Sequence, residues 1–505
     1  MYNKRINPLK QMHMKRKTIG TLLCGFLIIG QSFGQINEFD LADYKFPDYK
    51  RKALDFNFNL NARNNYLKNT IENSLYEKRN STYLSNSLYA NYQSITNSQK
   101  LQQSLSATLN LSMNNTHVDR DILDPSNSNT FSFSPSFYLN SVNRIYLKNL
   151  QFFEVSPNFI YRYGYYTFSS EQESFPDNEY DHNNNEIDLK LSFKFGFGRI
   201  EPVSDARQAI YILEGLQKQN SLAKELTNED VFEFAQLISK IKNKRYFDAR
   251  LRKIYELETI DNYLDSNHIV SESNIKYFTT LADFWDYGDR VYRSSGTRIA
   301  FVLKPGYYLN DDKTDRDQDS EEDKTRSAQL YTGLEFKYEK PIDLKWQNSI
   351  DISSYYGCVG VKQTNTIVDP VEKISDIPNI QVKFAQKIGF YPNTRTDLTF
   401  SYSILYYQFF DKTDITQDIY GIGNKGLEGL AQIAVNYYIS PQFKLNFIYS
   451  LDYSRRSSDA STNVISDYNY NLFMADNNYL NLINGDRDLK EINQTLRISL
   501  LYSLF

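Results

Sequence analysis

Long segments in which apolar and polar residues strictly alternate constrain the fold of this chain more than any other feature of its sequence. Segments 104–113, 398–406 and 443–454 all show this alternation. Strict alternation predicts a β-strand with one apolar and one polar face. About ten such residues are enough for a tilted strand to cross a bilayer. The 41 Tyr and 33 Phe suit a surface that is aromatic on one side and polar on the other.

The pattern predicts fourteen strands, separated by links that alternate in length. The strands are expected near 53–66, 82–96, 99–114, 129–141, 146–168, 184–200, 297–310, 327–340, 343–361, 378–391, 396–411, 427–440, 442–456 and 490–505. Short links are expected at Asn97-Ser98, Val142–Arg144, Pro341-Ile342, Pro392–Arg395 and Ser440-Pro441, and long polar links at 67–81, 115–128, 169–183, 311–326, 362–377, 412–426 and 457–489. Short turns on one side and long loops on the other are typical of an all-β membrane barrel. Antiparallel closure would satisfy every backbone group in the bilayer.

The period of the sequence changes once, at Pro202. Residues 187–197 alternate strictly, whereas apolar residues after Pro202 recur at steps of three and four. The later spacing predicts helices over 204–218, 228–243, 247–264 and 272–287. We therefore expect a helical insert, 201–296, between two barrel halves, 35–200 and 297–505. If the first strand rises from the periplasm, the insert starts and ends on the periplasmic side.

The N-terminus predicts export. Lys15–Lys17 precede an apolar run at 19–30, and small residues follow at Ser32 and Gly34. This order predicts a secretory signal peptide over 1–34. Its removal would leave 51 basic and 61 acidic residues, a net charge of −10, which argues against a nucleic-acid partner.

The last ten residues, LRISLLYSLF, end on an aromatic residue. Leu496, Ile498 and Leu500 share one face, and the chain ends at Phe505. The segment resembles the C-terminal strand of Gram-negative outer-membrane β-barrel proteins. The resemblance covers this strand and the general patterning, and it implies location in the cell outer membrane. It also implies that the barrel-assembly machinery reads Phe505 as an assembly signal, although Phe505 lies on the opposite face from the apolar residues.

Two groups of residues are candidates for function. Inward rows such as Ser104, Ser106, Thr108 and Asn110 could line a hydrated lumen or bond to a plug. The lumen-lining candidates are Lys190, Lys194, Lys444, Asn446 and Asp452. The helical insert carries a basic patch of Lys240, Lys242, Lys244, Arg245, Arg250, Arg252 and Lys253. This patch could contact anionic lipid headgroups or an acidic partner, or form an ordinary solvated helix face.

Catalytic and metal-binding signals are weak. His117 and His182 have acidic neighbours and are expected in outer loops. The sequence contains no H-E-x-x-H or G-x-S-x-G motif. Asp315, Asp317 and Asp319 are spaced as in a calcium loop, but the later positions lack its Gly and Glu. Only Cys358 would remain after signal cleavage, which excludes an intrachain disulfide. We expect no enzyme, no metal and no cofactor.

These features favour a channel or transporter for small or amphipathic solutes, with the helical insert as a gate, plug or docking site. The alternative is a non-transporting barrel that anchors a periplasmic or envelope-biogenesis partner through the insert. The expected partners are outer-membrane lipid, the barrel-assembly machinery and a periplasmic protein at the insert.

Overall fold

The structure is a computed structural model, and it describes fourteen parts of the chain. These are residues 39–70, 76–121, 125–172, 175–243, 249–271, 274–288, 291–316, 319–365, 373–410, 425–440, 443–457, 471–473, 479–481 and 489–502. The predicted signal peptide and Phe505 lie outside them.

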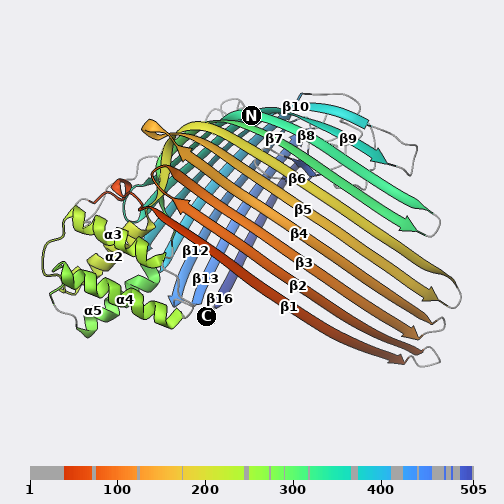
Figure 1. Cartoon of the computed structure of the whole chain (residues 1–505), viewed down its shortest axis with the longest axis horizontal. Helices are drawn as coiled ribbons and strands as arrows, with labels where there is room; N and C mark the ends of the chain where they lie inside the picture. Colours follow the sequence, from red (N-terminus) through yellow and green to blue (C-terminus); the bar gives the residue numbers. More distant parts are fainter. Residues whose placement is uncertain are drawn as a thin grey trace, which may run out of the picture.

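Fourteen antiparallel strands form one sheet in which the strand order follows the chain order (Figure 1). The strands are β1 (Tyr49–Thr70), β2 (Tyr76–Asn97), β3 (Leu101–Asp121), β4 (Ser126–Tyr146), β5 (Gln151–Gln172), β6 (Phe175–Pro202), β7 (Ser294–Arg316), β8 (Ser320–Pro341), β9 (Trp346–Asn365), β10 (Lys373–Asn393), β11 (Thr396–Phe409), β12 (Lys425–Ser440), β13 (Phe443–Ser457) and β16 (Leu489–Tyr502). The predicted number of strands is confirmed. The short strands β14 (Asn471–Phe473) and β15 (Tyr479–Asn481) form a separate two-stranded sheet.

Several strands are longer than predicted, because polar residues continue the hydrogen-bonded ladders beyond the apolar segments. The ladder between β7 and β8, for example, continues to Asp315 and Ser320. The long loops predicted at 67–81, 115–128, 169–183 and 311–326 are therefore wrong, and the links shrink to 71–75, 122–125, 173–174 and 317–319. The turn predicted at Val142–Arg144 is also wrong, because β4 continues to Tyr146. Segments of alternating Ser, Asn and Thr pair with a neighbouring strand as apolar segments do. The change from apolar to polar residues therefore did not predict where the strands end.

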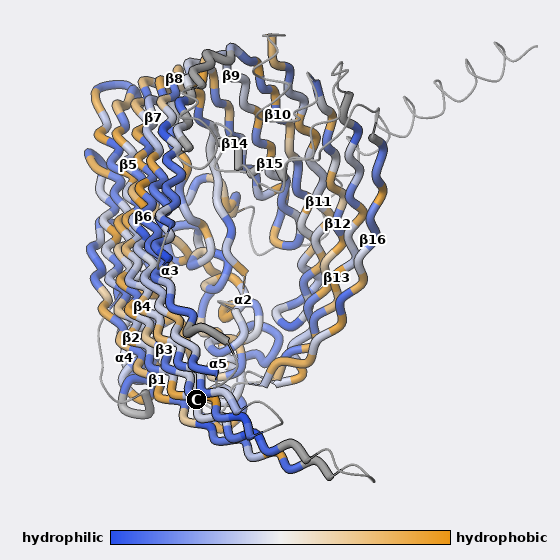
Figure 2. The backbone as a smooth tube through the Cα atoms, turned by 90° about the vertical axis from the view of Figure 1, so that its right-hand side faces the viewer, coloured by the Kyte–Doolittle hydropathy of each residue, from blue (hydrophilic) through white to orange (hydrophobic). Residues whose placement is uncertain are grey.

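The two faces of the sheet differ as predicted. Phe195 and Phe197 on β6 have 55% and 52% of their surface exposed. Lys194, which directly precedes Phe195, meets Glu335 of β8, two strands away. Side chains two strands apart can meet only on the concave face, so the apolar face of β6 is the outer one. Figure 2 shows the sheet curving around an interior, with β1 to β8 on one side and β11, β12, β13 and β16 on the other.

The two ends of the sheet carry different links. We call one the turn end, because the links 98–100, 147–150, 342–345 and 394–395 all lie there. The link 441–442 between β12 and β13 and the helical insert lie at this end too, and the other end, the loop end, carries the remaining links between neighbouring strands. Thirteen ladders connect β1 to β16 in order, and no ladder between the described residues of β1 and β16 joins these two edges.

The helical insert lies at the turn end, where it forms a small core of its own (Figure 1). Its helices are α2 (Ser204–Lys218), α3 (Asn228–Lys242), α4 (Ala249–Ser266) and α5 (Ile275–Gly288), close to the predicted ranges. A capping box at Thr227 and Asp230 starts α3. None of the helices in the described parts of the chain is long and apolar enough to cross a bilayer.

The core of the helical insert also contains residues from outside it. Phe39, Leu41 and Tyr44 precede β1 and are buried against the helices. The Tyr44 hydroxyl lies 3.0 Å from the Ser239 hydroxyl of α3. Leu344, from the turn between β8 and β9, joins the same core. We call the insert together with these residues the helical module.

Candidate functional site

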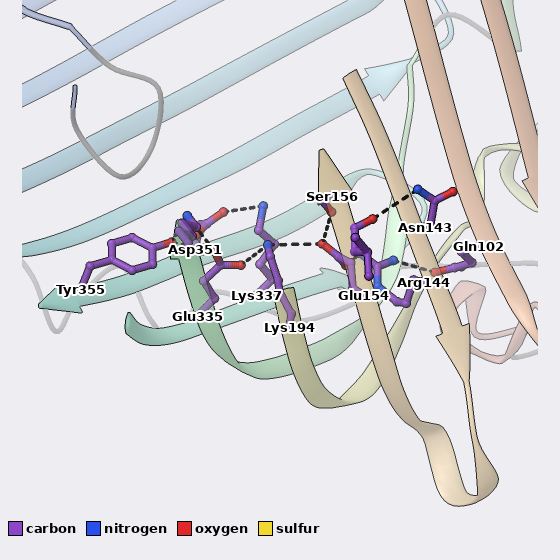
Figure 3. Close-up of polar contacts among 12 residues, drawn as sticks. Gln102, Asn143, Arg144, Glu154, Ser156, Lys194, Glu335, Lys337, Asp351 and Tyr355 are labelled. Atoms are coloured by element: carbon purple, nitrogen blue, oxygen red, sulfur yellow. Dashed lines mark hydrogen bonds and ion pairs between the residues drawn. The ribbon is translucent and has the colours of Figure 1, made fainter. Parts of the chain in front are cut away.

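Paired charges line the inner face of β4 to β9, and we call them the ion-pair belt. Its members are Arg144, Glu154, Lys194, Lys304, Glu335 and Tyr355, and Figure 3 labels all of them except Lys304. Lys194 Nζ lies 3.4 Å from a carboxylate oxygen of Glu154 and 2.6 Å from one of Glu335. Arg144 pairs with Glu154 from the other side. The belt therefore joins six strands through side chains alone.

Small residues between the charges make this geometry possible. Val302 of β7 lies opposite Lys194 in register, and Gly333 of β8 lies opposite Val302. A Cβ atom at Gly333 would stand 2.6 Å from the Tyr355 ring, so only glycine leaves room for that ring. The Tyr355 hydroxyl consequently reaches Glu335 and donates to it at 2.6 Å.

The belt is almost closed to water, and each of its charged side chains has a partner of opposite charge. The side chains of Glu154, Glu335 and Lys194 are 2%, 11% and 14% exposed. Lys304 adds a second cation 3.2 Å from Glu335, and Ser156 donates to Glu154 at 2.8 Å. A buried charge is tolerated where an opposite charge and hydrogen bonds compensate it, and the belt meets both conditions. It is a rigid wall rather than an open ion-binding site.

The other lumen-lining candidates lie on the same inner face. Lys190 pairs with the buried Asp188 at 3.1 Å. Lys444 lies over the Tyr438 ring, 5.3 Å from its centroid. Asn446 donates to Asn436 at 2.7 Å, and Asp452 is half-buried on β13. Their role in lining a permeation path stays a prediction.

The helical module contacts the sheet far from the strands that carry it. It is inserted between β6 and β7, yet Arg207 of α2 stacks over the Tyr391 ring of β10 at 5.3 Å. Arg395, in the turn between β10 and β11, forms an ion pair with Asp283 of α5 at 2.8 Å. Arg395 also lies 4.3 Å from the centroid of the Tyr287 ring. We call these contacts the distal junction.

A second set of contacts anchors the base of the module. Arg293, just before β7, donates to the carbonyl oxygens of Asp343, Leu344 and Trp346 at 2.6–2.7 Å. Its guanidinium is buried, and burial together with the charge of Arg207 lowers the pKa of Arg293 to about 10. Arg293 therefore stays protonated at neutral pH and holds the turn between β8 and β9 against the module.

Most described members of the predicted basic patch are paired within the module. Lys242 lies 2.7 Å from Asp205, Arg252 pairs with Glu256 at 2.6 Å, and Lys253 pairs with Asp286 at 2.6 Å. Lys240 is exposed, and Arg250 lies on α4. Lys244 and Arg245 lie outside the described residues. The patch is less strongly basic than its sequence suggests, because Glu256 on the same helix and two acidic residues distant in the chain, Asp205 and Asp286, neutralise part of it.

The predicted histidine sites are not in loops. His117 lies on β3 and His182 on β6, so their assignment to outer loops was wrong. His117 pairs with Asp119 at 3.1 Å, and His182 with Asp312 at 3.4 Å. Asp315 and Asp319 flank the tip of the β7–β8 hairpin. In the part of the chain that the structure describes, no three His, Cys, Asp or Glu side chains are placed to hold a metal ion.

Fourteen long antiparallel strands with an exposed apolar outer face and a polar inner face define a transmembrane β-barrel of the outer-membrane type. No protein-family model matches the chain, and no curated protein sequence matches it.

Solved structures show remote likenesses. The translocator domain of the autotransporter NalP from Neisseria meningitidis is 9% identical, with a TM-score of 0.24, over 79% of this chain and 91% of that one. The alcaligin outer-membrane receptor FauA from Bordetella pertussis is 9% identical, with a TM-score of 0.33, over 91% of this chain and 60% of that one. The transport unit of the autotransporter AIDA-I from Escherichia coli is 8% identical, with a TM-score of 0.24, over 79% of this chain and 93% of that one. The class stated above rests on the geometry of the strands.

Sequence reasoning missed the partners that complete the site. Glu154 and Glu335 have the inward parity of their strands, so the alternation could have identified both as inner charges. Arg144 was assigned to a turn. No local signal could have paired Lys194 with Glu335, which is 141 residues away in sequence.

Proposed function

We propose that this protein is an outer-membrane channel or transporter whose helical module closes the periplasmic end of the lumen. Short turns face the periplasm in barrels of this class, which supports a periplasmic location for the turn end and the module. The polar inner face supports passage of hydrated solutes. The distal junction is the observation that carries the proposal, because the module begins at β6 yet is held at β10 and β11.

The position of the helices fits a closing role. Figure 1 places the module at the turn end, and Figure 2 shows α2 and α5 between the two sides of the curved sheet. The base contacts of Arg293 are extensive and buried. In contrast, the ion pair between Arg395 and Asp283 is nearly half exposed, at 42% and 43%. The distal junction is therefore the weaker side of the module, and opening would begin there.

The test is conductance of the full chain in a planar bilayer. The variant Tyr391→Leu combined with Arg395→Ala removes both parts of the distal junction and should increase the open fraction. Lys253→Ala is the matched control, because it breaks an ion pair inside the module without touching the sheet. Equal conductance of the two variants would refute the gating role.

Replacement of Val203–Ser295 by a short Gly-Ser linker tests the same proposal more severely. If the module is a gate, the shortened chain should conduct more than the full chain. Phe39, Leu41 and Tyr44 lose their packing in this variant. We therefore add changes of all three residues to Ser, which avoids exposing an apolar segment. A shortened chain that folds but does not conduct would refute the channel proposal.

The alternative is a barrel that anchors a periplasmic partner. It is favoured by apolar residues on the surface of the module, where Ile275, Ile254 and Phe278 are 83%, 49% and 44% exposed. Under this alternative, Ile275→Ser with Phe278→Ser should abolish co-purification of a periplasmic protein while the conductance stays unchanged.

A further inference from the structure

The inner face of β1 to β4 differs in chemistry from the ion-pair belt. The registers align four rows of inner positions across these strands, at alternate residues of 55–61, 85–91, 108–114 and 132–138. The sixteen residues are six Asn, six Ser, two Tyr, one Thr and one Asp. We call this surface the hydroxyl–amide wall. It contains no cation and no aliphatic side chain.

Along the strands, the hydroxyl–amide wall lies at the same height as the exposed apolar residues of the outer face. Phe56, Phe58 and Leu60 alternate with the inner residues of β1 and are 69%, 66% and 63% exposed on the outer face. The polar groups of the wall consequently occur where a lumen would cross the hydrocarbon. At β5 the wall ends, because Arg162 contacts Tyr138 of β4 and Glu186 of β6 there.

Part of the hydrogen-bonding capacity of the wall is unused. Thr108 donates to Asn91 at 3.0 Å, and Asn114 donates to Ser132 at 3.1 Å. Within the described chain, however, no hydrogen bond engages the side chains of Asn57, Asn61 or Asn110. Each of these amides can donate two hydrogen bonds and accept two. They remain available to water or to a solute.

We propose that the hydroxyl–amide wall selects neutral, hydroxyl-rich solutes of the saccharide class. This inference rests on the proposed channel function and names its substrate class. A sugar hydroxyl both donates and accepts, and Asn, Ser and Thr side chains do the same. An anionic solute would lose hydration without meeting a cation on this wall, and a cationic solute would meet a single carboxylate, that of Asp55 at one edge. The belt on β4 to β9 offers no compensation, because its charges are already paired.

The experiment compares three solutes of similar size and different charge in a liposome-swelling assay. Glucose, glucosamine and glucuronate are offered to proteoliposomes that contain the full chain with Tyr391→Leu and Arg395→Ala, so that the distal junction is released. Glucose should enter fastest. A single hydrogen bond contributes about 0.5–1.5 kcal/mol, which corresponds to roughly a two- to tenfold difference in rate.

A pair of variants assigns the selectivity to the wall. Asn57→Leu with Asn110→Leu removes two inner amides of one row, which lie on either side of Tyr89, and should slow glucose entry by about twofold or more. Asn86→Leu is the matched control, because Asn86 lies on β2 with the outward parity of Leu60 and Met113. The control should leave glucose entry unchanged. The potassium chloride conductance of each variant reports that the barrel is folded and open.

The outcomes separate the two proposals. Equal entry of the three solutes through a conducting protein would overturn the saccharide inference and leave the channel function standing. Faster entry of a charged sugar, or no effect of the inner Asn variants, would overturn it as well. Absence of both swelling and conductance, with the junction released and with the module deleted, would refute the channel function and the inference together.

Discussion

Replacement of Lys194 by Met tests whether the ion-pair belt stabilises the barrel. Lys194 lies between the buried carboxylates of Glu154 and Glu335, at 3.4 and 2.6 Å. Loss of one partner of a buried pair costs about 3–5 kcal/mol. Each carboxylate keeps another cation, Arg144 or Lys304, so the loss should fall toward about 2–3 kcal/mol. The sequence predicted Lys194 only as a lumen-lining residue, and its two ion pairs add the expectation that it stabilises the fold.

Lys337 provides the matched control within the same barrel. It pairs with Asp351 at 2.8 Å on the inner face, but the two side chains are 41% and 42% exposed (Figure 3). Exposed pairs contribute about 0.2–1 kcal/mol. Lys337→Met should therefore lower the free energy of unfolding by less than about 1 kcal/mol. The difference between the two Lys variants measures the effect of burial.

The assay is urea unfolding of the protein in lipid or detergent micelles, followed by the heat-modifiable shift in electrophoretic mobility. The double variant Lys194→Met with Glu335→Gln should recover part of the loss, because it removes the buried carboxylate that Lys194→Met leaves with one cation, Lys304, in place of two. A coupling free energy of about 1.5–3 kcal/mol is expected from this cycle. Equal unfolding free energies for Lys194→Met and Lys337→Met would refute the reasoning.

Three further predictions concern the lipid face, the topology and the helical module. Phe195→Lys should lower the yield of assembled barrel, at a cost of about 2–4 kcal/mol, because it places a charge in hydrocarbon; assembly equal to that of Phe195→Leu would contradict the face assignment. Ser320→Cys, with Cys358→Ser to remove the native thiol, should label with a membrane-impermeant maleimide on intact cells, and labelling only after lysis would invert the topology. Asp230→Asn should lower the free energy of unfolding of α3 by about 1 kcal/mol at pH 7, measured by hydrogen exchange. Burial opposes ionisation of Asp230, but hydrogen bonds from Lys224 and Thr227 outweigh it and lower the pKa of Asp230. The stabilisation by Asp230 is therefore fully present above the ordinary carboxyl pKa. It disappears as the pH falls through the lowered pKa of the folded state. If the free energy of unfolding of α3 differed between the unmodified protein and Asp230→Asn by the same amount at every pH, this role of Asp230 would be contradicted.

Local periodicity was sufficient to predict the strands and helices of this protein and which face of a strand is apolar. A strand places alternate side chains on opposite faces, so Phe195 and Lys194 could be assigned to lipid and lumen from their order alone. The change of period after Pro202 likewise predicted all four helices. Both are properties of a few consecutive residues, which is why the sequence by itself determined them.

Contacts between distant residues required the tertiary structure. The curvature and register of the sheet bring Lys194 to Glu335, and packing brings Tyr44 to the core of the module. The strand ends also depended on tertiary pairing, since polar hairpins extend the ladders beyond the apolar segments. The contact between Arg207 and the Tyr391 ring also required the tertiary structure, because it depends on how the helices dock across four strands. Such contacts have no local periodicity, so only the folded chain decides which charges are paired, which amides stay available and where the module closes on the sheet.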